Sequence, residues 1–301
     1  MSVVVGFGSD TRSLAALDLA VEFARTTGEE LVITSVVQDS WDSLRDFAGV
    51  DDEWRRYVKE QTEEALAIAR AHLGEEADVV TVSRTASSVP QALLDESRAR
   101  NARLVVAGSA SHGALGRIAF GSTNGRLAHS SAIPVALAPR GFHAHDGGIE
   151  RLVVAVDPTA SDAALNGPIA SLALWLKVPV EIVTFAVRSG SRTAFAAFAD
   201  QGVREAWAAL VRQHQDQLAD GIRALAPGVD VTTTQVTSAE RWSLALDSFE
   251  WSPGDLLAVG SSRHGPVSRV FMGSTATRIV NHSPVPVILL PRPPRARAPR
   301  S

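Results

Sequence analysis

The sequence predicts an α/β protein of two tandem doubly wound domains, each with a five-stranded parallel sheet in the order 3-2-1-4-5 flanked by helices. Two observations carry this prediction. The chain repeats itself at a period of about 150 residues, and within each copy short β-branched runs alternate with longer segments of helical apolar spacing. The length of 301 residues also exceeds that of a usual single domain.

The repeat is clearest in the second part of each copy. The segment VVAGSASHGALGRIAFGSTNGRLAHSSAIPVALAPR, from Val105, recurs as LAVGSSRHGPVSRVFMGSTATRIVNHSPVPVILLPR, from Leu257. The first strands match as well, Val4 with Val153. We therefore expect one domain over residues 1–140 and a second over 149–292, joined at 141–148 by a Gly/His stretch that lacks apolar periodicity and is typical of a short linker.

Five parallel strands joined by crossover helices are expected in each copy. The runs at 102–107 and 256–259 are nearly all apolar, as in central strands that are buried on both faces. With the order 3-2-1-4-5, a ligand crevice is expected between strands one and four, beyond their carboxyl ends. The expected strands are 3–7, 31–37, 78–84, 103–108 and 134–138 in the first copy, and 152–156, 180–187, 230–236, 255–260 and 285–290 in the second.

Two further segments have a distinct composition. Residues 51–70 carry opposite charges at helical spacing together with apolar Trp54, Val58, Ala65 and Ile68, which predicts a solvated amphipathic helix. The tail at 293–301 is rich in proline and arginine, which predicts disorder.

Composition narrows the class of protein. A formal charge of -4 and a pI near 6.1 argue against nucleic acid as a partner, because phosphate-backbone affinity needs an excess of Lys and Arg. The chain has no cysteine, which excludes thiolate chemistry and fits a reducing compartment. The amino terminus opens directly on a strand-like run and no apolar stretch is long enough for a membrane span, so a cytoplasmic protein without a membrane partner is expected.

Each copy has a glycine loop after its fourth strand, followed by Gly-Ser-Thr at the start of a helix. These steps are Gly121 to Thr123 and Gly273 to Thr275. Serine or threonine at such a place caps a helix. The same geometry also presents backbone amides and the positive end of the helix dipole to a phosphate. Both interpretations remain open at this point.

These loops resemble those of the universal stress protein family, whose signature is a glycine, two residues, a glycine, nine residues and then Gly-Ser or Gly-Thr. Gly108 with Gly121 and Ser122 keeps the outer spacing, as does Gly260 with Gly273 and Ser274. The resemblance covers both copies from first strand to last and is to the tandem bacterial type. Ser111 and Arg263 stand where the family has its middle glycine.

The resemblance implies adenine-nucleotide binding, with ATP as the cofactor, and favours the second copy. There it assigns Asp157 to the ribose, the backbone around Phe185 to adenine, Gly260 to the sugar side, and Gly273 with Ser274 to phosphates. Arg263 would either pair with phosphate or fill the pocket. In the first copy Gly8 stands at the position of Asp157, with Asp10 two residues later. The corresponding first-copy residues are Val36, Gly108, Ser111, Gly121 and Ser122.

Two histidine patterns are interpreted as structural. Ser109 and His112 could form a nucleophile and a base, but no orienting acid accompanies them. A role in shaping the loop or in hydrogen bonding beside a phosphate is therefore favoured, and no catalytic residue is assigned. His143 and His145 lack further metal ligands nearby in sequence, which favours a flexible polar linker and no metal site.

The leading functional hypothesis is a stress-response protein that binds adenine nucleotide and signals through conformation or assembly. The resemblance implies a homodimer or an intrachain pseudo-dimer through the last strands, at 134–138 and 285–290. A scaffold with degenerate sites is the alternative. A weak nucleotide hydrolase is the second alternative, disfavoured because a GxxxxGK[ST] loop is absent from the sequence.

Overall fold

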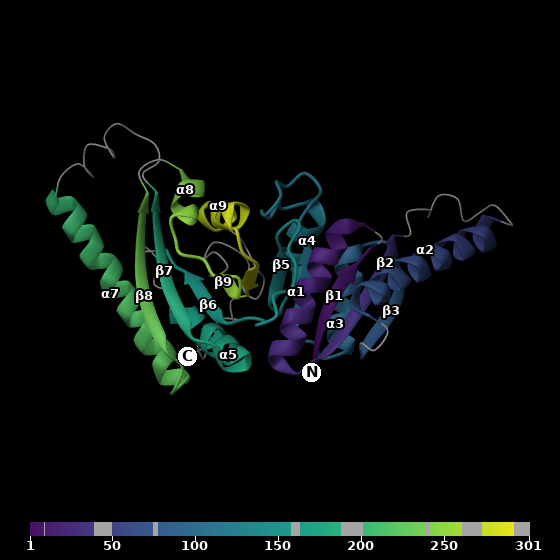
Figure 1. The fold of residues 1–301 in the computed structure, drawn as a ribbon, viewed down its shortest axis with the longest axis horizontal. Helices are drawn as coiled ribbons and strands as arrows, with labels where there is room; N and C mark the ends of the chain where they lie inside the picture. Colours follow the sequence, from purple (N-terminus) through teal and green to yellow (C-terminus); the bar gives the residue numbers. More distant parts are fainter. Residues whose placement is uncertain are drawn as a thin grey trace, which may run out of the picture. The chain divides into compact units, whose positions relative to one another are not determined.

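The computed structural model describes residues 1–8, 10–38, 50–74, 78–157, 163–187, 201–238, 241–260 and 273–291. The chain divides into two compact units, Met1–Gly148 and Ile149–Ser301, which are described separately. Both are built of parallel strands and crossover helices (Figure 1). The predicted tail at 293–301 and Arg263 lie outside the described residues.

In the first unit β1 pairs with both β2 and β4, β2 also pairs with β3, and β4 with β5, all in parallel. This is the expected order 3-2-1-4-5. Helix α1 contacts α2 and α3 contacts α4, as expected when right-handed crossovers place one pair on each face of the sheet. The elements are β1 Ser2–Phe7, α1 Thr11–Thr27, β2 Glu30–Gln38, α2 Val50–Leu73, β3 Val79–Ala86, α3 Val89–Ala99, β4 Leu104–Gly108, α4 Ser122–Ser130 and β5 Val135–Ala138.

The second unit has the same pairing, with β6 between β7 and β9, β8 beside β7 and β10 beside β9, again all parallel. All ten expected strands are present, with ends displaced by at most two residues. The elements are β6 Arg151–Ala155, the 3₁₀ turn η1 Ala163–Leu165, α5 Asn166–Leu176, β7 Val180–Val187, α7 Gln201–Leu225, β8 Val231–Ser238, α8 Trp242–Asp247, β9 Asp255–Gly260, α9 Ser274–His282 and β10 Val287–Leu290.

The central strands form the core of each unit. Leu104, Val105 and Val106 in β4 have no exposed surface, and the same holds for Leu256 and Leu257 in β9. Apolar side chains on both faces of these strands are therefore removed from water, as the continuous apolar runs predicted. The resulting sheets are rigid platforms whose carboxyl ends carry the loops.

Helix α2 confirms the predicted helix but corrects its apolar face. Val58, Thr62, Ala65 and Ala69 are buried, and their spacing of three or four residues places them along one side of the helix. Ile68 is 36% exposed. Successive residues of an α-helix are rotated by about 100° around its axis, so Ile68, which precedes Ala69, lies beside this stripe and not on it. The sequence pattern misassigned Ile68 because a single apolar residue next to the stripe looks like part of it.

The segment 141–148 is ordered in the structure rather than a flexible linker. The backbone amide of His145 donates to Glu22 Oε1 of α1 at 2.5 Å, and the amide of Gly148 donates to the carbonyl of His145 at 3.1 Å. Gly148 has a φ of 68°, which favours glycine, and a Cβ there would stand 2.7 Å from Thr26 Oγ1. The segment therefore packs directly against α1.

Among the described helices, none is both long enough and apolar enough to cross a membrane.

Candidate functional site

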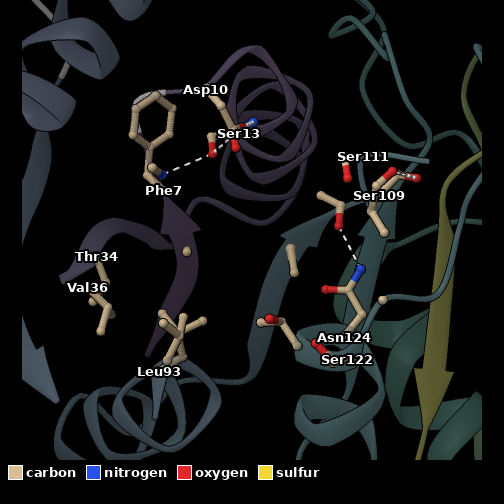
Figure 2. Close-up of a pocket in the computed structure, with 18 of the residues that line it drawn as sticks. Phe7, Asp10, Ser13, Thr34, Val36, Leu93, Ser109, Ser111, Ser122 and Asn124 are labelled. Atoms are coloured by element: carbon tan, nitrogen blue, oxygen red, sulfur yellow. Dashed lines mark hydrogen bonds between the residues drawn. The ribbon is translucent and has the colours of Figure 1, made fainter. Parts of the chain in front are cut away.

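A pocket of about 580 Å³ lies at the carboxyl ends of β1 and β4 in the first unit, where the order of strands reverses. Its walls come from the ends of β1, β2 and β4, the loop after β4, and the first turns of α3 and α4 (Figure 2). This volume is in the range of small-molecule sites. The predicted crevice between strands one and four therefore corresponds to a real cavity.

All five first-copy residues that the resemblance implied line this pocket, together with Gly8 and Asp10. Val36 comes from β2 and Gly108 ends β4, while Ser111 belongs to the following loop. Gly121 and Ser122 form the start of α4. The structure thus brings together positions that are separated by as many as 114 residues in sequence, from Gly8 to Ser122.

The loop after β4 is braced from within. Ser109 is 4% exposed, and its hydroxyl accepts a hydrogen bond from the amide of Ala119 at 2.8 Å. The amide of Ala110 donates to the carbonyl of Ala119 at 3.0 Å, and Arg140 Nη1 donates to the carbonyl of Gly113 at 2.9 Å. The Ser109 hydroxyl therefore acts in shaping the loop, as favoured over a nucleophilic role.

The start of α4 corrects the expected helix cap. The N-cap residue is Gly121, in extended conformation, and Ser122 is already the first helical residue, so neither Ser122 nor Thr123 caps the helix. A Cβ on Gly121 would stand 2.9 Å from Cβ of Ala110, closer than side chains approach. Glycine is therefore required at 121 for the loop residue Ala110 to lie this close to the start of α4. The first turn of α4 faces the pocket.

Asn124 is a pocket residue that the sequence did not single out. It is 5% exposed, and its Nδ2 donates to the carbonyl of Gly108 at 2.8 Å (Figure 2). The contact ties the first turn of α4 to the last residue of β4, across 16 positions of sequence. Ala276 stands at the matching place in the second copy and cannot make such a contact. This difference between copies was the signal that could have identified Asn124.

Asp10 places a carboxylate at the pocket although Gly8 lacks one. Oδ1 of Asp10 accepts from both the amide and the hydroxyl of Ser13, each at 3.1 Å. The Ser13 hydroxyl in turn accepts from the amide of Gly8 at 2.9 Å (Figure 2). These contacts cap α1 and fix the carboxylate on the pocket lining.

Thr34 is a second residue that sequence reasoning missed. It lies in β2 beside Gly6 of β1 and lines the pocket, yet it has no exposed surface. Its Oγ1 has no hydrogen-bond partner in the structure. Val183 stands at the matching position of the second unit. Polarity at the base of the pocket therefore distinguishes the first unit from the second.

In the second unit the structure places the predicted residues individually. Asp157 is exposed just after β6, and Gly273 with Ser274 begins α9, where Gly273 is again the N-cap. Phe185 is 6% exposed and its ring packs edge-on against Phe249, with centroids 6.1 Å apart. The connecting loop at 261–272, with Arg263, lies outside the described residues, so no second pocket can be assembled from them.

Gly260 at the end of β9 has a packing reason for being glycine. A Cβ at this position would stand 2.4 Å from Cδ1 of Leu165, a residue that is 3% exposed. The side chain of Leu165 thus covers one face of the Gly260 backbone. Any contact of Gly260 with a sugar would have to use another face.

Across the described residues, no group of three or more His, Asp or Glu side chains is arranged to hold a metal ion.

Comparison with known proteins agrees with this architecture. The model of the universal stress protein family matches residues 1–139 and again 148–291. Universal stress protein Rv2319c of Mycobacterium tuberculosis H37Rv is 34% identical over 298 residues, covering 97% of this chain and all of the relative. Universal stress protein Mb2346c of Mycobacterium bovis matches to the same extent.

A solved structure shares the fold over nearly the whole length. The crystal structure of a universal stress protein from Archaeoglobus fulgidus DSM 4304 has a TM-score of 0.62 at 19% identity, covering 97% of this chain and 98% of that one. A likeness at this identity shows the fold, whereas the two family matches and the relatives at 34% identity show descent. The chain belongs to the universal stress protein family.

Proposed function

We propose that the chain binds an adenine nucleotide, ATP in the first instance, and acts in stress response through a change of conformation or assembly rather than through turnover. The observation that carries this proposal is the first-unit pocket, which opens at the strand-order reversal onto the first turn of α4. Family membership supports the same ligand class. Assembly through a last strand and a cytoplasmic location stay predictions.

The pocket offers complementary groups for each part of a nucleotide. Backbone amides at the start of α4, after Gly121, suit phosphate oxygens, because helix amino termini carry unpaired N–H groups and partial positive charge. Gly108 leaves the end of β4 open to the sugar, and the β2 backbone around Val36 can pair with the edge of a base. Asp10 supplies a carboxylate for sugar hydroxyls at the rim.

The second unit is expected to bind more tightly, since Asp157 provides the acid at the end of its first strand where the first unit has Gly8. The described pocket, however, lies in the first unit. We therefore propose two nucleotide sites of unequal affinity. The calorimetric titration also tests which of the two binds more tightly.

Calorimetric titration of ATP into the full chain tests the proposal. We expect saturable heat, and we expect Gly121→Val to remove the first-unit site, because its side chain would collide with Ala110 and enter the pocket. Gly273→Val is the equivalent change for the second unit. Gly125→Ala is the matched control on α4, since a Cβ there meets nothing within 4 Å. The affected sites should lose at least tenfold in affinity, about 1.4 kcal/mol.

Two results would count against this proposal. One is the absence of saturable heat together with no nucleotide in the denatured extract of the purified chain, which would favour the scaffold. The other is steady ATP turnover that Gly273→Val abolishes, which would favour a hydrolase.

A further inference from the structure

The floor of the first-unit pocket is a row of three residues on neighbouring strands. Thr34 of β2 is the register partner of Gly6 of β1, and Ala107 of β4 follows Val106, which pairs with Val5. All three residues of the row line the pocket. We call Thr34, Gly6 and Ala107 the floor row. It carries little side-chain bulk, since glycine has no side chain and alanine has a single methyl group.

The floor row reaches the end of the pocket that suits a nucleotide base. Thr34 and Val36 are two residues apart on β2, so their side chains extend from the same face of the sheet. Figure 2 shows both at one side of the pocket, and Ser122 and Asn124 of α4 at the other. With phosphates at the start of α4, as in the proposed function on which this inference rests, the base lies over Thr34 and Val36.

Thr34 adds a polar group to this floor. Thr34 has no exposed surface, and its hydroxyl has no hydrogen-bond partner among the described residues. A buried hydroxyl without a partner costs free energy, which a ligand that pairs with it would recover. Because a hydroxyl both donates and accepts, it can pair with either kind of group on the edge of a base.

The side chain of Leu93 covers part of the floor row. Its Cδ1 would lie 2.8 Å from a Cβ at Gly6, the register partner of Thr34. Side-chain rotamer changes are common when a ligand binds. A movement of Leu93 would therefore give a base access to the floor row.

The matching row of the second unit is larger and entirely apolar. Ala155 of β6 pairs in register with Val183 of β7 on one side and with Val259 of β9 on the other. Val183 has no exposed surface, and Val259 and Ala155 are 3% and 8% exposed. Compared with the floor row, this row has one more carbon atom at Ala155 and two more at Val259, and a methyl group of Val183 replaces the hydroxyl.

The wall beside the floor differs in the same direction. Val89 is the first residue of α3 and lines the first-unit pocket. Trp242 is the first residue of α8, the helix that stands at the same place in the second unit. The second unit therefore has a bulkier or less polar residue at each of these four matching positions.

We propose that the two nucleotide sites differ in base selectivity: the first unit accepts guanine as well as adenine nucleotides, whereas the second accepts adenine nucleotides alone. Guanine carries two exocyclic polar groups, O6 and the 2-amino group, where adenine has one amino group. It therefore needs more room and more hydrogen-bond partners. The floor row offers small residues and a hydroxyl, and the matching row of the second unit offers neither. Burial of a polar group without a partner is costly.

Calorimetric titration of ATP and GTP into chains that keep one site tests this difference. Gly273→Val leaves the first unit, where we expect GTP to bind within about tenfold of ATP. Gly121→Val leaves the second unit, where we expect GTP to bind about a hundredfold more weakly than ATP, the size of discrimination that an apolar pocket reaches against an added polar group.

Exchanging the floor rows tests the cause. On the Gly273→Val background, Thr34→Val together with Ala107→Val gives the first unit the second unit's side chains at these two positions. GTP affinity should fall about tenfold. ATP affinity should change little, because adenine is expected to fit against the same residues in the second unit. Gly125→Ala on α4 is the control and should leave the ratio of GTP to ATP affinity unchanged.

The reciprocal exchange is Val183→Thr with Val259→Ala on the Gly121→Val background, and it should raise GTP affinity about tenfold. Equal ratios of GTP to ATP affinity in the two isolated sites overturn the proposal. An exchange that leaves this ratio unchanged, or that weakens both ligands equally, also overturns it. If one unit alone binds ATP, the exchange in that unit decides. If neither unit binds ATP, the proposed function is wrong and base selectivity falls with it.

Discussion

Replacing Asp255 by alanine is expected to lower the free energy of unfolding of the second unit by about 3–5 kcal/mol. The Asp255 carboxylate has no exposed surface and binds Arg151 with both oxygens, at 2.8 Å from Nε and 2.6 Å from Nη2. It also accepts from the amide of Ser252 at 2.7 Å. Its removal leaves a mostly buried guanidinium with one anionic partner, Glu181, and takes the acceptor away from the Ser252 amide.

This pair closes the amino-terminal edge of the second sheet, since Arg151 begins β6 and Asp255 begins β9. The hydrogen bond to Asp255 is the largest cause of the raised pKa of Arg151. Without Asp255 the guanidinium still stays charged, because the ordinary pKa of arginine lies far above neutral pH. Burial of a charge that only Glu181 then compensates destabilises the fold. Hydrogen exchange of the β9 amides at increasing urea concentrations measures the loss of unfolding free energy in this unit alone.

Asp220→Ala is the matched control for that experiment, because Asp220 pairs with Arg223 on the exposed side of α7 and such pairs contribute about 0–1 kcal/mol. The triple change Arg151→Met, Asp255→Leu and Glu181→Gln should recover much of the stability, since it removes all three charges together. If Asp255→Ala lowers the free energy of unfolding by less than 1 kcal/mol, the ion pairs of Arg151 with Asp255 and Glu181 do not have the structural role assigned to them.

Asn124→Leu is expected to weaken ATP binding to the first unit by about tenfold, or 1.4 kcal/mol, while leaving adenosine binding nearly unchanged. Leucine has a similar volume but cannot donate to the carbonyl of Gly108, so the first turn of α4 loses its tie to β4. Only a ligand with phosphates uses that turn. This prediction rests on the proposed function. Asn124 is expected to act by positioning the first turn of α4, and not by contacting the phosphates itself.

The ratio of ATP to adenosine affinity separates positioning from a general loss of structure. Calorimetry on a Gly273→Val background isolates the first unit, and Gly125→Ala on the same helix should leave the ratio unchanged. If the affinities for ATP and for adenosine fall equally in Asn124→Leu, Asn124 acts on the fold as a whole. If wild-type protein binds neither, the proposed function itself is wrong.

The architecture was predictable because it depends on short-range patterns that occur twice. Strands such as β4 are apolar along almost their whole length, and the repeated Gly-Ser-Thr steps mark where a helix begins. Right-handed crossovers then favour a doubly wound sheet, and in the order 3-2-1-4-5 the pocket is expected at the strand-order reversal. The five residues carried over to the first copy therefore lie together in the structure.

What the sequence did not show depends on contacts between distant residues. The Asn124 to Gly108 bond and the buried hydroxyl of Thr34 leave no local pattern, because an asparagine or threonine in such places is equally compatible with solvent exposure. The capping role of Ser122 was misjudged by one position, since the helix begins at the serine and not after it.

The segment 141–148 was misinterpreted for the same reason. A Gly/His stretch without periodicity has the composition of a flexible linker, and its partners on α1 lie more than 115 residues earlier in the chain. Only the fold shows that Asp18 and Glu22 are buried and face it. Two carboxylates four residues apart in an otherwise apolar stretch of α1, residues 14–24, were the available signal.

A crystal structure of the full chain grown with ATP tests the central claim most directly. We expect density for the nucleotide between the ends of β1 and β4 of the first unit, with phosphate oxygens at the amides that follow Gly121. A second nucleotide at the start of α9, after Gly273, would establish the unequal pair. Density at neither place in crystals saturated with ATP, or a nucleotide bound elsewhere on the chain, would contradict it.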